Sequence, residues 1–245
     1  MQLLTLEAPV FAARCTVVVA DDGACVVVDP GAGTAAAVLD AVRERGLRPL
    51  AVHLTHGHAD HTWDAAAVAD GLDVPVRVHA ADEYRLHDPF GTLGPLGGAS
   101  HDPSGPLAQA LAAAGVDVGA YRRPTRVETF GAPGAEGAAR SADVTWQVGE
   151  VTVVGRHAPG HTEGSTLYLL DAGDDRPVAL TGDVLFAGTI GRTDLPGGDG
   201  AAMATTLREV VSRLDPRTVV VPGHGPTSDV ASELRSNPYL TAPDR

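Results

Sequence analysis

The stretch Thr55-His56-Gly57-His58-Ala59-Asp60-His61 places four side chains that can bind a metal ion within six residues. It directly follows an apolar run at 50–54, which is typical of a short buried strand. A loop at a strand end can turn all four side chains toward one point, and Gly57 and Ala59 leave room for that approach. A surface histidine cluster or an expression tag is the alternative interpretation, but tags lie at chain termini and seldom place Asp between histidines. The stretch therefore predicts a metal-binding loop.

Three further candidate ligands each follow another predicted strand. They are His161 after the strand at 151–156, Asp183 after the strand at 178–180, and His224 after the strand at 218–221. Each is weak evidence alone, since Gly-His and Gly-Asp pairs are common in loops. Together with the loop at 55–61 they give five imidazoles and two carboxylates at strand ends. This donor set suits two neighbouring divalent ions, with one carboxylate as the bridge.

Predicted strands and helices interleave along the chain. Strands are expected at 15–20, 24–29, 50–54, 74–78, 144–147, 151–156, 165–170, 178–180 and 218–221. Helices are expected at 34–45, 60–70, 201–214 and 229–236. Hairpins and interspersed helices in one chain of this length predict an α/β fold, with two sheets and helices outside, in a single domain over 1–245.

Residues 88–142 differ in composition from the rest of the chain. Gly, Pro and Ala dominate there, and only 107–114 predicts a helix. The segment is too long for a passive connection. We interpret it as an insertion whose part at 90–98 forms a substrate wall or lid beside the metal loop; a tolerated surface insertion is the alternative.

Charge, hydropathy and cysteine content limit the classes of binding partner and the cellular compartment that we expect. The net charge is −13, from 31 acidic and 18 basic residues, which argues against nucleic acid and anionic membranes as partners. The apolar runs are too short to span a bilayer, and the first residues lack the features of a secretory signal. Cys15 and Cys25 flank a predicted turn without facing each other, so we expect reduced thiols and a cytoplasmic protein. A small molecule is the expected partner, and the oligomeric state is left open.

The order of the motifs resembles the metallo-β-lactamase superfamily over nearly the whole chain outside 88–142. The motifs are Asp29-Pro30-Gly31, the loop at 55–61, His161, Asp183 and His224. Within that superfamily, the segments 182–199, 222–226 and 237–240 are similar to short bacterial hydrolases of glyoxalase II type, which act on hydroxyacylglutathione. The resemblance implies an αββα sandwich of two mixed sheets, with the metals at one edge.

The resemblance also implies a role for each candidate ligand. The first metal would be held by His56, His58 and His161, and the second by Asp60, His61 and His224, with Asp183 bridging the two. The implied cofactors are two divalent ions, zinc in the first place, with iron or manganese as alternatives. Asp60 would also orient the nucleophile, so Asp60 and Asp183 are the expected catalytic residues.

The implied reaction is zinc-dependent hydrolysis of a small (2-hydroxy)acyl thioester. Two ions sharing a hydroxide would attack the thioester carbonyl, and the thiolate can leave without a dedicated acid. Asp183 stands where many β-lactamases have a cysteine, so antibiotic hydrolysis is not expected. Asp194 stands where a family tyrosine helps to hold glutathione, so the carrier thiol is left open.

Two further residues are candidates for supporting roles. Asp29 is either a turn residue or a partner that orients the metal-binding imidazoles. Arg192 is interpreted as a cation at the mouth of the site that holds a substrate carboxylate, with a loop cap as the alternative.

The remaining histidines and Trp63 are expected outside the centre. His53 is predicted as a core histidine with satisfied hydrogen bonds, His157 as a structural loop residue, and Trp63 as core packing. The other three, which lack a partner pattern, are predicted on the surface: His79, His87 and His101.

The main alternative function is a persulfide dioxygenase of the same superfamily. In that enzyme, His56, His161 and Asp183 would form a mononuclear iron site of two imidazoles and one carboxylate. The complete second-metal set favours hydrolysis. A non-catalytic binding module would require lost ligands, and none of the seven is lost.

Overall fold

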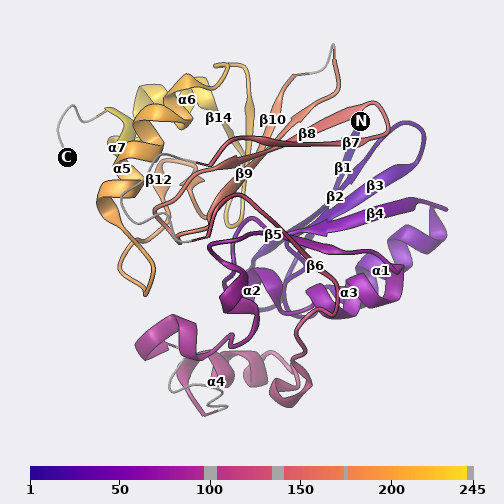
Figure 1. Cartoon of the computed structure of the whole chain (residues 1–245). Coiled ribbons are helices and arrows are strands. Elements are labelled where there is room, and N and C mark those ends of the chain that lie inside the picture. The colour runs from indigo at the N-terminus through magenta and orange to yellow at the C-terminus, as the bar shows by residue number, and fades with distance from the viewer. Residues whose placement is uncertain (97–103, 134–140, 174–175, 242–245) are drawn as a thin grey trace.

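Two six-stranded sheets face each other in the computed structural model, which describes residues 1–96, 104–133, 141–173 and 176–241 (Figure 1). The first sheet follows chain order: β1 (Gln2–Glu7), β2 (Arg14–Val19), β3 (Ala24–Val28), β4 (Arg48–His53), β5 (Val76–His79) and β6 (Val127–Phe130). Neighbours are antiparallel from β1 to β3 and parallel from β3 to β6.

The second sheet has the order β14-β13-β10-β9-β8-β7. Its strands are β7 (Val144–Val148), β8 (Val151–His157), β9 (Thr166–Asp171), β10 (Val178–Gly182), β13 (Val219–Pro222) and β14 (Ser228–Asp229). Only β10 and β13 pair in parallel. A separate ribbon joins β11 (Leu185–Phe186) to β12 (Thr189–Ile190). Both main sheets are therefore mixed, as expected.

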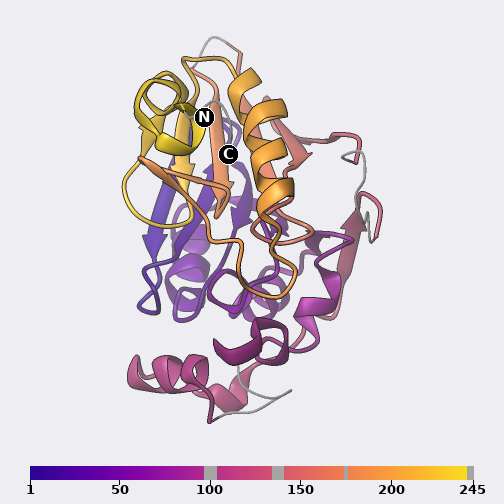
Figure 2. The same cartoon turned by 90° about the vertical axis from the view of Figure 1, so that its left-hand side faces the viewer.

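Helices cover the outer face of each sheet, which gives four layers. On the first sheet lie α1 (Ala35–Glu44), α2 (Ala59–Thr62) and α3 (Ala65–Leu72); on the second lie α5 (Gly200–Glu209), α6 (Val230–Ser236) and α7 (Pro238–Thr241) (Figures 1 and 2). The predicted αββα sandwich is confirmed. The predicted helix at 60–70 divides into α2 and α3, and the one at 201–214 ends at Glu209, before the 3-10 turn η4 (Val211–Arg213).

Successive side chains of β2 point to opposite faces of the sheet, so this one strand contributes to two hydrophobic clusters. Val17 and Val19 pack with the α1 and α3 side chains, whereas Val18 packs between the two sheets. Because both faces of the central strands are buried, their sequences read as continuous apolar runs. Cys15 and Cys25 lie in these buried strands as free thiols, as expected.

Residues 88–142 contribute to the sandwich as well as extending from it. The predicted helix appears as α4 (Pro106–Ala113), between the 3-10 turns η2 (Gly91–Leu96) and η3 (Val118–Ala120), and extends below the sandwich in both views (Figures 1 and 2). No strand was expected there, yet β6 completes the first sheet. Residues 97 and 98 of the substrate wall expected at 90–98 lie outside the described residues, as do 99–103 and 134–140 of the insertion.

Two histidines differ from expectation. His79 is buried rather than exposed, and its ring stacks on that of His157 at 4.0 Å between centroids. His53 is in the core, but neither ring nitrogen has a hydrogen-bond partner among the described residues. Instead the ring lies edge-on to Trp146 and Tyr168. His87 is exposed, as predicted, and His101 lies outside the described residues.

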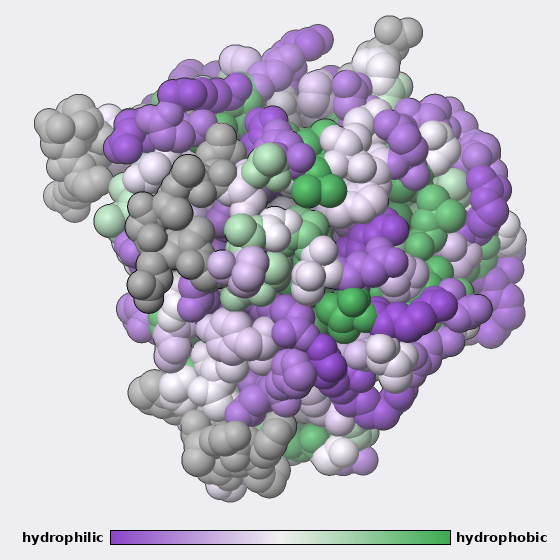
Figure 3. All heavy atoms as spheres, in the orientation of Figure 1, coloured by the Kyte–Doolittle hydropathy of each residue, from purple (hydrophilic) through white to green (hydrophobic). Residues whose placement is uncertain are grey.

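The face of the molecule shown in Figure 3 is largely polar. Hydrophilic side chains cover most of the face in Figure 3, and hydrophobic residues appear on it only in small separate patches. Within the described ranges, none of the helices is both long and apolar enough to cross a membrane.

The carboxyl ends of several strands meet at one edge of the sandwich. The parallel strands β3, β4 and β5 lead to Asp29, to the loop at 55–61 and to a turn at 80–85. In the second sheet, β8, β10 and β13 lead to His161, Asp183 and His224. The loops that follow these strands can therefore supply side chains to one shared site.

Candidate metal centre

The loop at 55–61 is fixed at its start by a buried carboxylate. The Thr55 backbone N–H donates to Asp29 Oδ1 at 2.7 Å, and the Thr55 hydroxyl donates to Asp29 Oδ2 at 2.6 Å. The loop then enters α2 at Ala59. His56 and His58 in this connection and His61 in α2 are all buried.

The structure brings the first expected ligand set together. One ring nitrogen from each of His56, His58 and His161 lies within 4.8 Å of the others. His161 Nδ1 is 2.8 Å from the Arg192 backbone oxygen, and since a carbonyl can only accept, Nδ1 donates. Its Nε2, 2.9 Å from His58 Nδ1, is then left with a lone pair toward the centre.

The second expected set is also brought together, from Asp60, His61 and His224. His224 Nδ1 donates to the Phe11 backbone oxygen at 2.9 Å, so its Nε2 points to the centre, 3.2 Å from His61 Nε2. Asp60 Oδ2 is 3.3 Å from His224 Nε2. The far nitrogen of His61 is held as well, with Nδ1 3.0 Å from Asp29 Oδ2.

Asp183 stands between the two sets. Its Oδ1 is 3.3 Å from His61 Nε2, and its Oδ2 is 3.5 Å from His224 Nε2 and 3.7 Å from His161 Nε2. A Cβ at position 223 would lie 2.4 Å from Asp183 Oδ1, so Gly223 is needed for this carboxylate to sit where it does. The position suits a ligand shared by two ions.

Unsatisfied polar atoms and charge show that the centre fits divalent cations. Among the described residues, His56 Nε2 and Asp183 Oδ1 are buried at the centre without a hydrogen-bond partner, which is costly unless something else binds them. Burial, together with neighbouring imidazoles, holds the pKa of His56 and His58 well below the usual value, so both are neutral and able to ligate.

The carboxylates require positive charge nearby. Burial alone would raise the pKa of Asp183, but His61 and His224 hold it well below its usual range. Conversely, burial lowers the pKa of His224, and hydrogen bonds to Asp183 and Asp60 more than reverse this, to about 9. Protonated imidazoles thus balance the negative charges of Asp60 and Asp183. Divalent ions would supply this positive charge in the metal-loaded site.

The two supporting candidates have different surroundings. Asp29 is 2 % exposed, adopts a positive φ of 53°, and holds both Thr55 and His61 as described above. The Arg192 guanidinium is half exposed and forms a bidentate pair with Asp194, at 2.7 and 2.9 Å. It is the backbone oxygen of Arg192 that reaches His161.

Sequence reasoning missed Asp82 and Arg85, which are both fully buried beside the loop at 55–61. Neither belongs to a recognisable motif, because they stand singly around the 3-10 turn η1 (Glu83–Leu86). One signal was available: Asp82 follows β5, the parallel neighbour of β4, just as the loop follows β4 itself.

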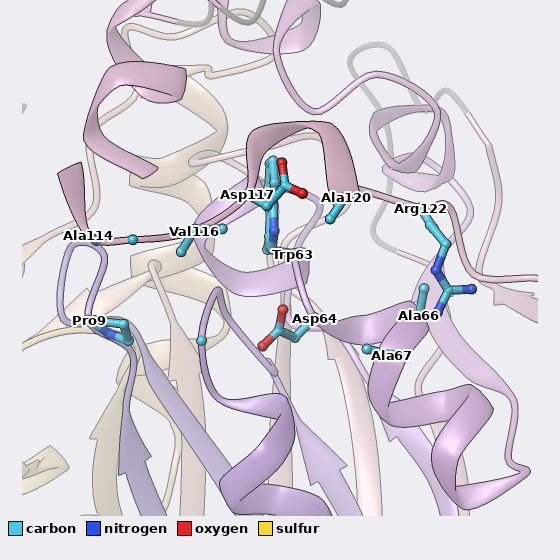
Figure 4. A pocket seen from close by; sticks show the side chains of 12 residues that line it. Pro9, Trp63, Asp64, Ala66, Ala67, Ala114, Val116, Asp117, Ala120 and Arg122 are labelled. Carbon is cyan, nitrogen blue, oxygen red and sulfur yellow. The ribbon is translucent and has the colours of Figure 1, made fainter. Parts of the chain in front are cut away.

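A cavity of about 460 Å³ is lined in part by Trp63 and by none of the seven candidate ligands. Figure 4 shows Asp64, Ala66 and Ala67 on one side, and Val116, Asp117 and Ala120 opposite. Trp63 is buried and packs against Phe90 and Tyr121, as expected of a core residue. The cavity is therefore separate from the metal centre.

Comparison with known proteins supports the family inferred from these motifs. The family model described as "Metallo-beta-lactamase superfamily" matches residues 8–224. An uncharacterized protein of Mycobacterium tuberculosis is 35% identical over 98% of both chains. The probable metallo-hydrolase YqgX of Bacillus subtilis is 33% identical over 89% of this chain and 88% of its own. Hydroxyacylglutathione hydrolase GloC of Haemophilus influenzae is 28% identical over 99% of both.

Two solved structures are similar over nearly the whole length. The B3 metallo-beta-lactamase BLEG-1 is 29% identical, with a TM-score of 0.71 over 98% of this chain and 100% of that one. TTHA1623, solved in a di-iron-bound form, is 30% identical, with a TM-score of 0.68 over the same shares. The similarity thus extends to proteins with different named activities, a hydroxyacylglutathione hydrolase and a metallo-beta-lactamase, and to one solved in a di-iron-bound form.

Proposed function

The chain belongs to the metallo-β-lactamase superfamily, and from this premise we propose that it is a binuclear metal-dependent hydrolase of glyoxalase II type. Its substrate is a small (2-hydroxy)acyl thioester. The observation that carries the proposal is the convergence of two ligand sets on Asp183, where the ligand is a carboxylate and not a thiol. The 28% identity to hydroxyacylglutathione hydrolase GloC supports the substrate class.

The seven candidate ligands form one set of three for each ion, and the seventh is shared. His56, His58 and His161 would hold one divalent ion, Asp60, His61 and His224 the other, and Asp183 both. When bound, the ions supply Lewis acidity, which lowers the pKa of water and stabilises negative charge on a carbonyl oxygen. Zinc is the proposed metal; the related di-iron structure makes iron the chief alternative.

Asp60 is proposed to orient the nucleophile as well as to bind metal. His61 and His224 outweigh burial and lower the pKa of Asp60, so the carboxylate is ionised and accepts hydrogen bonds. A thiolate leaves without protonation, so no residue has to act as a general acid. Amide nitrogen is a much poorer leaving group, which is why thioesters are favoured over β-lactams.

Arg192 is proposed to bind a carboxylate of the substrate. Its pair with Asp194 is exposed, and solvent screens such pairs so that they contribute little, which lets a substrate carboxylate compete with Asp194. The segment 88–142 is proposed as a wall beside the substrate, because Phe90 and Leu93 pack with Ala59 of α2 in one apolar cluster.

The test is a comparison of kcat/KM between substrate classes. We expect the zinc-loaded protein to hydrolyse lactoyl thioesters of several thiols at least 100-fold more efficiently than a cephalosporin, and Asp60→Asn to abolish the activity. Similar values for both classes would contradict the proposal and favour a lactamase like the B3 enzyme. Oxygen consumption with glutathione persulfide, without thioester hydrolysis, would instead support the dioxygenase.

A further inference from the structure

Asp82 and Arg85 form a buried ion pair that neither ligand set includes. Both side chains are 0% exposed, and Arg85 Nε lies 3.4 Å from Asp82 Oδ1. Burying two charges is costly, and the cost is recovered only where further hydrogen bonds satisfy them. The partners of this pair therefore indicate what the pair does.

Asp82 binds the two segments that carry the first ligand set. Its Oδ2 accepts the Gly57 backbone N–H at 2.8 Å, and Gly57 lies between His56 and His58. The same oxygen accepts the hydroxyl of Thr162, the neighbour of His161, at 2.7 Å. Oδ1 accepts the Gly164 backbone N–H at 2.8 Å. A single carboxylate thus fixes the loop of the first sheet to the loop of the second.

Arg85 extends these contacts to two more segments. Its guanidinium donates to the Pro196 backbone oxygen at 2.8 Å, to the Thr92 backbone oxygen at 3.2 Å and to Glu163 Oε2 at 2.5 Å. Pro196 belongs to the loop whose Arg192 carbonyl holds His161 Nδ1. Thr92 belongs to the segment 88–142. Arg85 therefore connects the first ligand set to the proposed substrate wall.

Glycines make room for the pair in three separate loops. A Cβ on Gly57 would lie 2.7 Å from both Cβ and Cδ of Arg85, and one on Gly164 would lie 2.6 Å from Asp82 Cγ. A Cβ on Gly197 would lie 2.1 Å from Arg85 Nη2. Close backbone approach from three directions shows that the loops are fitted to the pair, and not merely adjacent to it.

We propose that Asp82 is the positioning residue of the first metal: it holds His56, His58 and His161 in ligating geometry, and Arg85 fixes Asp82 and the adjoining loops. The inference rests on the proposed two-metal site. The second set has separate supports, since Phe11 holds His224 and Asp29 holds His61. Loss of Asp82 should therefore weaken one ion far more than the other.

The test is stepwise removal of metal from the loaded, full-length protein by a competing chelator. In Asp82→Asn, which cannot accept all three hydrogen bonds, we expect one ion to be lost at 10- to 100-fold lower chelator concentration and the other as in wild type. Thr162→Val, which removes the hydroxyl bound to Asp82 and to Ser165 and leaves the Asp82 carboxylate, should shift the same ion by a smaller factor. Asp229→Asn, which alters the N-cap of the distant helix α6, is the matched control and should shift neither.

Hydrogen exchange supplies a second readout in the same samples. The Gly57 and Gly164 amides should exchange faster in Asp82→Asn, while those of α6 should not change. Equal retention of both ions in Asp82→Asn and Thr162→Val, or equal weakening of both ions, would overturn the proposal. These outcomes are independent of thioester hydrolysis: a wild-type protein that holds one ion would overturn the two-metal function, whereas the affinity for that ion would still test Asp82.

Discussion

At the scale of residues, the centre depends on which imidazole nitrogen faces inward. His161 and His224 donate Nδ1 to backbone carbonyls, and His61 Nδ1 faces a carboxylate. In each case the outer hydrogen bond fixes the tautomer and leaves Nε2 for a ligand. Hydrogen bonds made outside the centre therefore determine which imidazole nitrogens face a metal ion in it.

Asp29→Ala should reduce metal affinity by roughly 10- to 100-fold, since such outer partners typically contribute that much. The variant removes the acceptor for Thr55 and for His61 Nδ1 and leaves buried donors unpaired. Metal titration by calorimetry measures the effect. Unchanged affinity would show that Asp29 is only a turn residue.

Stability should fall in acid because of His79. Burial, aided by His157, lowers the pKa of His79 to about 4, from an ordinary value of 6.5. Between these two values the unfolded chain binds a proton that the folded chain does not, so the free energy of unfolding decreases as pH drops from 6.5 to 4. His79→Gln should flatten this part of the Tm-against-pH curve; a curve as steep as wild type would contradict the assignment.

Substitution of Arg192 and substitution of Asp194 should change KM in opposite directions. If Arg192 binds a substrate carboxylate, Arg192→Ala should raise KM for succinyl thioesters several-fold and Asp194→Ala should lower it, because Asp194 competes for the guanidinium. Acetyl thioesters of the same thiol, whose acyl group has no carboxylate, are the control. Equal effects on both substrates would exclude this role.

At the scale of elements, α4 packs in the same apolar cluster as residues that adjoin the candidate ligands. Leu111 is 0% exposed and belongs to the apolar cluster that includes Trp63 and Ala59. Leu111→Ala should cost about 2–5 kcal/mol in stability and, if the segment walls the substrate, raise KM with both ions retained. Leu207→Ala, a buried leucine of α5, should lower Tm without changing KM. An unchanged KM in Leu111→Ala would indicate that α4 belongs to a surface insertion that takes no part in substrate binding.

Most strands could be predicted, because β2, β3 and β4 are apolar runs that end in Gly, Asp or His signals. The short strand β6 could not be, since Val127 to Phe130 lie in a Gly/Pro/Ala-rich stretch and gain their strand pairing only from β5. The candidate ligands were visible as a motif. Asp82 was not, because its partners Gly57, Thr162 and Gly164 belong to two loops that are distant from it in sequence and meet it only in the fold.

At the scale of the whole molecule, the two halves of the sandwich supply the centre jointly. The first sheet leads to His56, His58, Asp60 and His61, and the second to His161, Asp183 and His224. Each expected ion takes ligands from both halves, so bound metal links the two sheets. Asp82 makes the same connection without metal, through Gly57 and Thr162.

The metal content of purified protein tests the central claim most directly. We expect two divalent ions per wild-type chain, one in His224→Ala, and none retained tightly in Asp183→Ala, because His224 serves one ion and Asp183 both. Elemental analysis after gel filtration gives the stoichiometry. A single iron per wild-type chain, or two tightly bound ions in Asp183→Ala, would contradict the account.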